Sequence, residues 1–179
     1  MTEPLLVGRI ANLEIPRAVL EASWRHVARR GSGRHEAIVI WAGRVAHAGA
    51  RVVTAVAPPP EDVQASARLH RLNTRAHASM SRWMERHGLL ALAQVHTHPD
   101  SWVGHSETDD AYPFAPDDGF LSIVWPRYAL GAVAPMSEWG VHERRDDTWY
   151  QLLPSEVLRR LFVVSDPATV TDMPLVEVA

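Results

Sequence analysis

Apolar residues gather along this chain in short runs, separated by longer segments in which they recur every three or four positions. The short runs predict strands, because they are too brief for helices and are bounded by glycine and proline. They lie at residues 5–15, 35–42, 51–56, 89–95 and 120–125, followed by a pair at 140–145 and 148–152. Gly43 and Gly49 bracket one expected hairpin, and Asp146-Asp147 is the expected turn of another.

The segments with helical period alternate with these runs. Residues 17–30 follow Pro16 and predict a helix that ends at the Gly-Ser-Gly of residues 31–33. A second helix is predicted to start at the acidic pair Glu61-Asp62 and to end near Gly88, and a third covers residues 154–162. The apolar stripe of the second helix would be Leu69, Leu72, Ala76, Met80 and Trp83.

This alternation favours an α/β protein, with one mixed-sheet domain flanked by helices. We place the domain at residues 1–165, because no linker or internal repeat interrupts it. Residues 166–179 are interrupted by prolines and are expected to form a loose C-terminal tail.

Composition narrows the classes of function. The 179 residues are 46% hydrophobic, contain no cysteine and carry a formal net charge of -3. The lack of cysteine excludes disulfides, thiolate zinc sites, cysteine nucleophiles and the zinc deaminases with their Pro-Cys-x-x-Cys ligands. The net charge argues against a nucleic-acid partner. Without a signal-peptide pattern or a long apolar run, we expect a cytoplasmic protein with no membrane association.

The richest polar stretch is His-x-His-Pro, six residues, then Ser-x-x-Asp. His96 and His98 end an apolar strand and point to the same face, because strand side chains alternate. The Ser-x-x-Asp box can start a helix, with Ser106 as its N-cap, that brings the carboxylate of Asp109 back to the histidines. Zinc without thiolate ligands prefers imidazole nitrogen and carboxylate oxygen, and its catalytic sites keep three protein ligands. His96, His98 and Asp109 therefore form the candidate Zn²⁺ site.

Catalysis by such a site needs an acid–base group outside the ligand set. Glu36, in the early apolar run that follows the Gly-Ser-Gly turn, is our candidate. Two roles are open to Ser106, and they do not exclude each other. Its oxygen can accept a backbone hydrogen bond as an N-cap, and its own proton can stabilise the oxyanion of a tetrahedral intermediate.

These residues resemble the motif of the JAMM, or MPN-plus, metalloproteases: an upstream Glu, His-x-His-Pro, six residues, and Ser-x-x-Asp. The resemblance covers roughly residues 5–125 and matches the compact prokaryotic kind. It implies a cytidine-deaminase-like (JAB/MPN) fold and a zinc isopeptidase that cuts after the C-terminal glycine of a ubiquitin-like or sulfur-carrier protein. An activating-enzyme system encoded nearby is the implied partner.

The roles of two residues near the motif stay open. Trp102 either grips an extended peptide at the mouth of the site or packs down, and His105 is a further candidate for substrate contact. Two other functions also stay open at this point. One is a non-catalytic binding scaffold of the MPN type, and the other is a member of the same fold associated with DNA repair.

Overall fold

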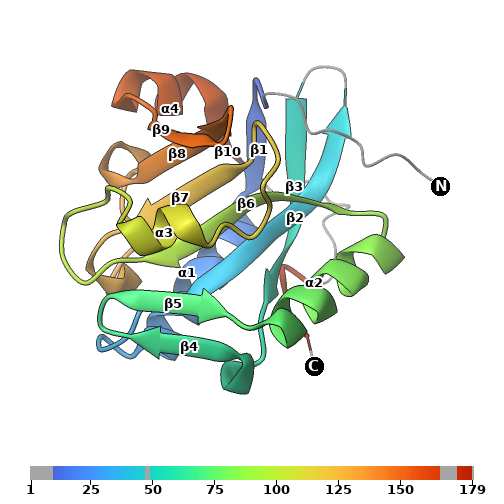
Figure 1. Cartoon of the computed structure of the whole chain (residues 1–179). Helices are drawn as coiled ribbons and strands as arrows, with labels where there is room; N and C mark the ends of the chain where they lie inside the picture. Colours follow the sequence, from blue (N-terminus) through green and yellow to red (C-terminus); the bar gives the residue numbers. More distant parts are fainter. Residues whose placement is uncertain (1–9, 47–48, 166–172, 179) are drawn as a thin grey trace.

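The structure is a computed structural model that describes residues 10–46, 49–165 and 173–178. Its centre is a mixed sheet with the strand order β10-β1-β3-β2-β6-β7-β8-β9, and β11 pairs with β3 beside β1 (Figure 1). The strands of this sheet are β1 (Leu13–Pro16), β2 (Ile38–Ala46), β3 (Gly49–Ala57), β6 (Leu90–Thr97), β7 (Leu121–Trp125), β8 (Gly140–Arg145), β9 (Thr148–Gln151), β10 (Leu161–Val164) and β11 (Leu175–Glu177).

The helices cover both faces of the sheet. In Figure 1, α1 lies behind the sheet, whereas α2 and α3 lie in front of it. The α-helices are α1 (Arg17–Gly31), α2 (Thr74–Arg86), α3 (Glu107–Ala111) and α4 (Pro154–Arg160). The short 3-10 helices are η1 (Pro60–Asp62), η2 (Arg127–Ala129) and η3 (Met136–Glu138). A separate two-stranded sheet consists of β4 (Val63–Ser66) and β5 (Leu69–Leu72).

Burial on both faces explains why the central strands are apolar runs without a period of two. Along β2, Val39 and Trp41 belong to the core on the α1 side, while Ile38 and Ile40 belong to the core that contains Met80 of α2. The expected mixed-sheet α/β fold is therefore confirmed.

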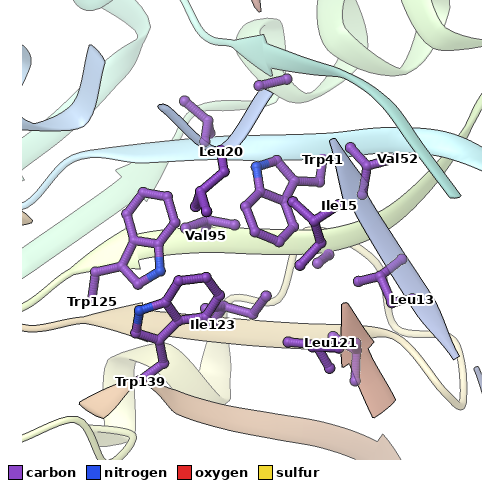
Figure 2. Close-up of a cluster of buried hydrophobic side chains, with 14 of the residues drawn as sticks. Leu13, Ile15, Leu20, Trp41, Val52, Val95, Leu121, Ile123, Trp125 and Trp139 are labelled. Carbon is purple, nitrogen blue, oxygen red and sulfur yellow. The ribbon is translucent and has the colours of Figure 1, made fainter. Parts of the chain in front are cut away.

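Tryptophans fill much of the core on the α1 side. The Trp125 ring centroid lies 4.8 Å from that of Trp24, 6.0 Å from that of Trp41 and 5.6 Å from that of Trp139. Figure 2 shows Trp125 and Trp139 side by side, with Trp41 across the cluster near Ile15. The Trp41 Nε1–H donates to Ser23 Oγ at 3.0 Å, so this buried indole keeps a hydrogen bond.

The predicted helix from residue 61 was wrong in its first half. Residues 63–72 form the β4–β5 hairpin, and α2 begins only at Thr74. Asn73 is its N-cap, because the Asn73 side chain accepts a hydrogen bond from the backbone N–H of Ala76. Leu69 and Leu72 kept the helical spacing by coincidence. Tertiary hydrogen bonds hold the hairpin instead, including one from the Glu36 N–H to the Ser66 carbonyl at 2.9 Å.

The ends of several other elements also differ from expectation. The strand expected at residues 35–42 begins at Ile38 and continues to Ala46, with a bulge between Ala42 and Gly43. Of the strand expected at residues 5–15, residues 5–9 lie outside the described residues. From residue 10 onwards the observed strand is Leu13–Pro16, which extends one residue beyond the expected end. The helix expected at residues 154–162 ends at Arg160, because the chain then pairs with β1 as the parallel strand β10.

The C-terminal segment is part of the sheet. Residues 166–172 and 179 lie outside the described residues, but Leu175–Glu177 forms β11 and pairs in parallel with residues 55–57 of β3. The expectation of a loose tail therefore fails for this stretch, because β3 offers an unpaired edge beyond its short contact with β1. No helix in the described part of the chain is long and apolar enough to span a membrane.

Candidate functional site

Strand β6 delivers two histidines to the site. His96 pairs with Ile38 of β2 and with Val124 of β7, and it is fully buried. His98 follows the end of the strand, where its N–H donates to the Trp125 carbonyl at 2.9 Å. Because the two residues are two apart on extended chain, their side chains share one face of the sheet.

Asp109 reaches these histidines from α3. Its Oδ1 lies 3.3 Å from His96 Nε2, and its Oδ2 lies 3.4 Å from His98 Nε2. The predicted capping box is confirmed: Ser106 N–H donates to Asp109 Oδ2 at 2.7 Å, and Asp109 N–H donates to Ser106 Oγ at 3.3 Å. Local capping thus aims the Asp109 carboxylate at the end of β6.

The histidine nitrogens fit a metal. His96 Nδ1 has no hydrogen-bond partner in the described part of the structure, and Nε2, although 3.3 Å from Asp109 Oδ1, makes no well-aligned hydrogen bond there, an unusual state for a buried polar group. Burial also lowers the pKa of His96 well below its ordinary value, so the ring is in the neutral form that binds metals. The Trp102 carbonyl lies 3.1 Å from His98 Nδ1 and accepts a hydrogen bond from Nδ1–H, so Nε2 is the nitrogen that faces Asp109.

Asp109 supplies the negative charge of the set. Burial alone would raise the pKa of Asp109, but its contacts with His96 and His98 and the N–H of Ser106 lower that pKa below its usual range. The carboxylate is therefore ionised at neutral pH. Two imidazoles and one carboxylate, without thiolate, form a donor set suited to zinc.

Glu36 meets this site through strand register. The antiparallel register between β2 and β6 places Ile38 opposite His96, and two residues further along the same register Glu36 lies opposite His98. The Glu36 side chain is 4% exposed, and its Oε1 lies 3.9 Å from His98 Nε2. The sheet thus brings together residues that are sixty positions apart, as the predicted site requires.

One buried histidine beside the site was missed from the sequence. His70 of β5 places Nδ1 3.2 Å from Glu36 Oε2, and its ring centroid lies 4.3 Å from that of His96. Potential ligand atoms lie within 4.8 Å of one another in two groups, His70–His96–Asp109 and Glu36–His98–Asp109. His70 was hidden because its segment was read as helix. The N-cap signal of Asn73 would have ended that reading at Leu72.

Trp102 and His105 occupy different environments. The Trp102 side chain is half exposed and stacks on His98, with ring centroids 5.1 Å apart. His105 is packed inward: its ring stacks on His142 at 3.7 Å, and its nitrogens contact Asp110 and Ser122, each at 2.9 Å. Trp102 is thus the candidate that faces solvent, and His105 supports the start of α3.

The loop between the two halves of the motif is held by close backbone contacts. A Cβ atom added to Gly140 would lie 1.8 Å from the Val103 carbonyl oxygen, so only glycine allows β8 to approach this loop. A second backbone contact is made by residues 127–129, which adopt three consecutive left-handed conformations. Within this segment, Tyr128 N–H donates to the His98 carbonyl at 2.7 Å. Non-glycine residues hold such strained conformations mainly at functional sites.

A family comparison matches this geometry. The family model described as prokaryotic homologues of the JAB domain matches residues 16–144. This chain belongs to that family. The matched range contains Glu36, the two histidines of β6, Ser106 and Asp109. The resemblance stated from the motif is therefore confirmed.

A relative agrees with this assignment to the prokaryotic JAB family. The chain is 29% identical over 168 residues to the "Probable metalloprotease y4jG" of Sinorhizobium fredii, covering 87% of this chain and 96% of the relative. At the level of the family, the protein is thus a metal-dependent peptidase of the JAMM type.

Two solved structures support the fold. Protein DSY2949 of Desulfitobacterium hafniense has a TM-score of 0.63 at 15% identity and covers 87% of this chain and 95% of its own. A protein from Salinibacter ruber has a TM-score of 0.53 at 17% identity and covers 88% of this chain and 94% of its own. At such low identities the likeness concerns the fold alone.

This JAB domain has a pocket of about 170 Å³ between α1, the start of β2 and β4. It is lined by His26, Arg30, Glu36, Ala37, Ile38, Pro58, Pro60, Val63 and Ala65. His26 is 3% exposed, and burial lowers its pKa to about 4, although Glu177, 3.4 Å from Nδ1, partly opposes this shift. Arg30 and Arg29 lower the pKa further.

We expect His26 to make the metal-free protein sensitive to acid. Its folded-state pKa lies below the ordinary 6.5, so the unfolded chain binds more protons between these values. The contribution of neutral, buried His26 to the free energy of unfolding is fully present above about pH 7. It is lost as the pH falls from about 6.5 towards 4. The free energy of unfolding is measured with urea at pH 7.5 and at pH 4.5. Between these two pH values it should fall by about 2 kcal/mol less in His26→Phe than in the wild type. Equal losses in both proteins would contradict this assignment.

Proposed function

We propose that the protein is a zinc-dependent isopeptidase or peptidase that hydrolyses the bond after the C-terminal glycine of a ubiquitin-like or sulfur-carrier protein. The observation that carries the proposal is the convergence of Glu36 on the site formed by His96, His98 and Asp109. A carboxylate beside two imidazoles and one anionic ligand is an arrangement suited to metal-assisted hydrolysis.

Zinc is the metal that these donors favour. Magnesium and calcium prefer sites made of oxygen ligands, whereas imidazole nitrogen suits zinc and other late transition metals. His96 and His98 would each bind through Nε2, and Asp109 would bind through its carboxylate. When bound, zinc supplies a Lewis acid and lowers the pKa of water towards about 7.

Glu36 would transfer protons, and Ser106 would stabilise the oxyanion. Glu36 would take a proton from the attacking water and transfer it to the leaving amine as the carbon–nitrogen bond breaks. The Ser106 hydroxyl donates to Asp109 Oδ2 at 2.8 Å in this structure. To stabilise the oxyanion, it would turn from that carboxylate to the substrate carbonyl. Its role as N-cap does not compete, because there its oxygen accepts.

The position of Trp102 beside the site supports the proposal of an extended substrate with glycine at the scissile bond. The exposed ring of Trp102 stacks on His98 and forms an apolar wall beside the ligands. A polypeptide tail that passes this wall would contact the indole, and glycine would bring the least bulk to the metal. We further propose that the protein acts in the cytoplasm beside an activating-enzyme system encoded nearby.

The test is cleavage of defined fusions by the zinc-loaded protein. The probes are ubiquitin and a bacterial ubiquitin-like protein ending in Gly-Gly, each joined to a reporter by a peptide or a lysine isopeptide bond. We expect cleavage after the second glycine, loss of activity with a chelator and recovery with zinc. Fusions ending in Ala-Ala are the matched control and should remain intact.

Two outcomes would overturn the proposal. A zinc-loaded protein that forms a stable complex with the modifier but cleaves no fusion would favour the binding scaffold. A DNA affinity that falls steeply with salt, without cleavage, would favour the member associated with nucleic acid.

A further inference from the structure

His70 is a buried polar residue at the site that the motif Glu, His-x-His-Pro, Ser-x-x-Asp does not include. We propose that His70 is a positioning residue for Glu36: it holds one carboxylate oxygen so that the other faces the metal. This inference rests on the proposed function only for its kinetic consequence. The arrangement itself can be tested in a protein that cleaves nothing.

The hydrogen bond to Glu36 carries the proposal. His70 Nδ1 lies 3.2 Å from Glu36 Oε2, and the two side chains are 5% and 4% exposed. A carboxylate oxygen accepts hydrogen bonds, so His70 Nδ1–H is the donor in this contact. Glu36 Oε1 is left facing His98 Nε2 at 3.9 Å. The two oxygens of Glu36 therefore have different tasks.

The contacts of His70 favour this role over direct metal binding. Its Nδ1 is engaged by Glu36 Oε2 at 3.2 Å, whereas His96 Nε2 lies beside Asp109 Oδ1 at 3.3 Å. The rings of His70 and His96 pack against each other, with centroids 4.3 Å apart and planes tilted by 32°. Because potential ligand atoms of His70, His96 and Asp109 also lie within 4.8 Å of one another, the zinc affinity of a His70 variant distinguishes a positioning residue from a ligand.

The β4–β5 hairpin holds Glu36 at two points. Glu36 N–H donates to the Ser66 carbonyl of β4 at 2.9 Å, and His70 of β5 binds the side chain. The turn between these strands is anchored in turn, because Tyr128 OH donates to the Ala67 carbonyl at 2.9 Å. The hairpin thus fixes both the backbone and the carboxylate of the acid–base group.

The test compares two substitutions at His70 with a matched control elsewhere. His70→Phe keeps a ring against His96 but removes the donor, whereas His70→Asn places an amide N–H near the position of Nδ1. His77→Phe is the control: it removes the hydrogen bond from His77 Nε2 to the Phe114 carbonyl and can retain the stacking on Phe114. Each purified protein is loaded with zinc, and zinc affinity is measured by competition with a chelator.

On a fusion that the wild type cleaves, we expect His70→Phe to lower kcat by about 10- to 100-fold, as loss of a supporting hydrogen bond does at metal sites. KM and zinc affinity should stay close to wild type. His70→Asn should recover most of kcat, and His77→Phe should resemble the wild type. A large loss of zinc affinity in His70→Phe would instead make His70 a ligand and overturn the proposal, as would an unchanged kcat.

Crystals of the zinc-loaded wild type, His70→Phe and His70→Asn give a readout independent of activity. We expect the Glu36 carboxylate to leave its place in His70→Phe and to keep it in His70→Asn. A carboxylate that keeps its place in His70→Phe would overturn the proposal. If the wild type cleaves no fusion, the proposed function fails, and the crystals alone still decide whether His70 positions Glu36.

Discussion

Glu36→Gln is expected to lower kcat by about 10²- to 10⁴-fold without removing zinc. The substitution keeps the shape of the side chain and an oxygen that can accept from His70 Nδ1, which lies 3.2 Å away in the wild type. It removes the ability to take a proton from water. KM should change little, because the group acts mainly in the transition state. Steady-state cleavage of the modifier fusion, together with zinc content by mass spectrometry, measures both effects.

The chain offers a control for this experiment. Glu14 also lies on an early strand, but it pairs with Arg51 at 3.1 Å and is partly exposed. Glu14→Gln should therefore cleave as the wild type does. If Glu36→Gln retained full kcat, Glu36 would not be the acid–base group, and the proposed mechanism would have to be abandoned.

Asp109→Asn is expected to lower zinc affinity by more than about 100-fold and to abolish cleavage at limiting zinc. Changes to groups that only support a metal ligand already cost about 10- to 100-fold. Asp109 is the anionic member of the proposed ligand set and lies within 3.4 Å of both histidine Nε2 atoms. Its replacement leaves two neutral imidazoles, which bind zinc more weakly than a set that includes a negative charge. Chelator competition gives the affinity directly.

The neighbouring residue provides the matched control. Asp110 has the same side chain on the same helix, but it is 55% exposed and contacts His105 at 2.9 Å. Asp110→Asn should bind zinc as the wild type does. Should Asp109→Asn keep the zinc affinity of the wild type, a different ligand set would hold the metal, with His70 and Glu36 as the nearest replacements.

Much of the site follows from short-range rules in the sequence. The period of two in an extended chain directs His96 and His98 to one face, whatever surrounds the strand. Ser106 and Asp109 form a capping box, which is a contact over three residues. For this reason, the side chains from β6 to α3 could be predicted from spacing to lie close together. The structure then supplied the distances that join them.

Register and the hairpin were decided by tertiary structure. Glu36 reaches the site because β2 pairs with β6 in one register, and a slip of one residue would turn its side chain to the other face. His70 depends on contacts of the β4–β5 hairpin with Glu36 and Tyr128, which no local pattern encodes. Leu69 and Leu72 alone do not distinguish a helix from a strand, because the apolar pattern of so short a segment is compatible with either.

The sequence by itself determined the histidine pair on one face of β6, the cap that aims Asp109, and the apolar strands that can be buried on both faces. Only the tertiary structure decided which carboxylate meets the histidines and which further histidine supports it. The physical reason is range: periodicity and capping act within a turn or two of chain. The contacts of Glu36 and His70 depend on where the sheet and the hairpin place segments that are distant in sequence.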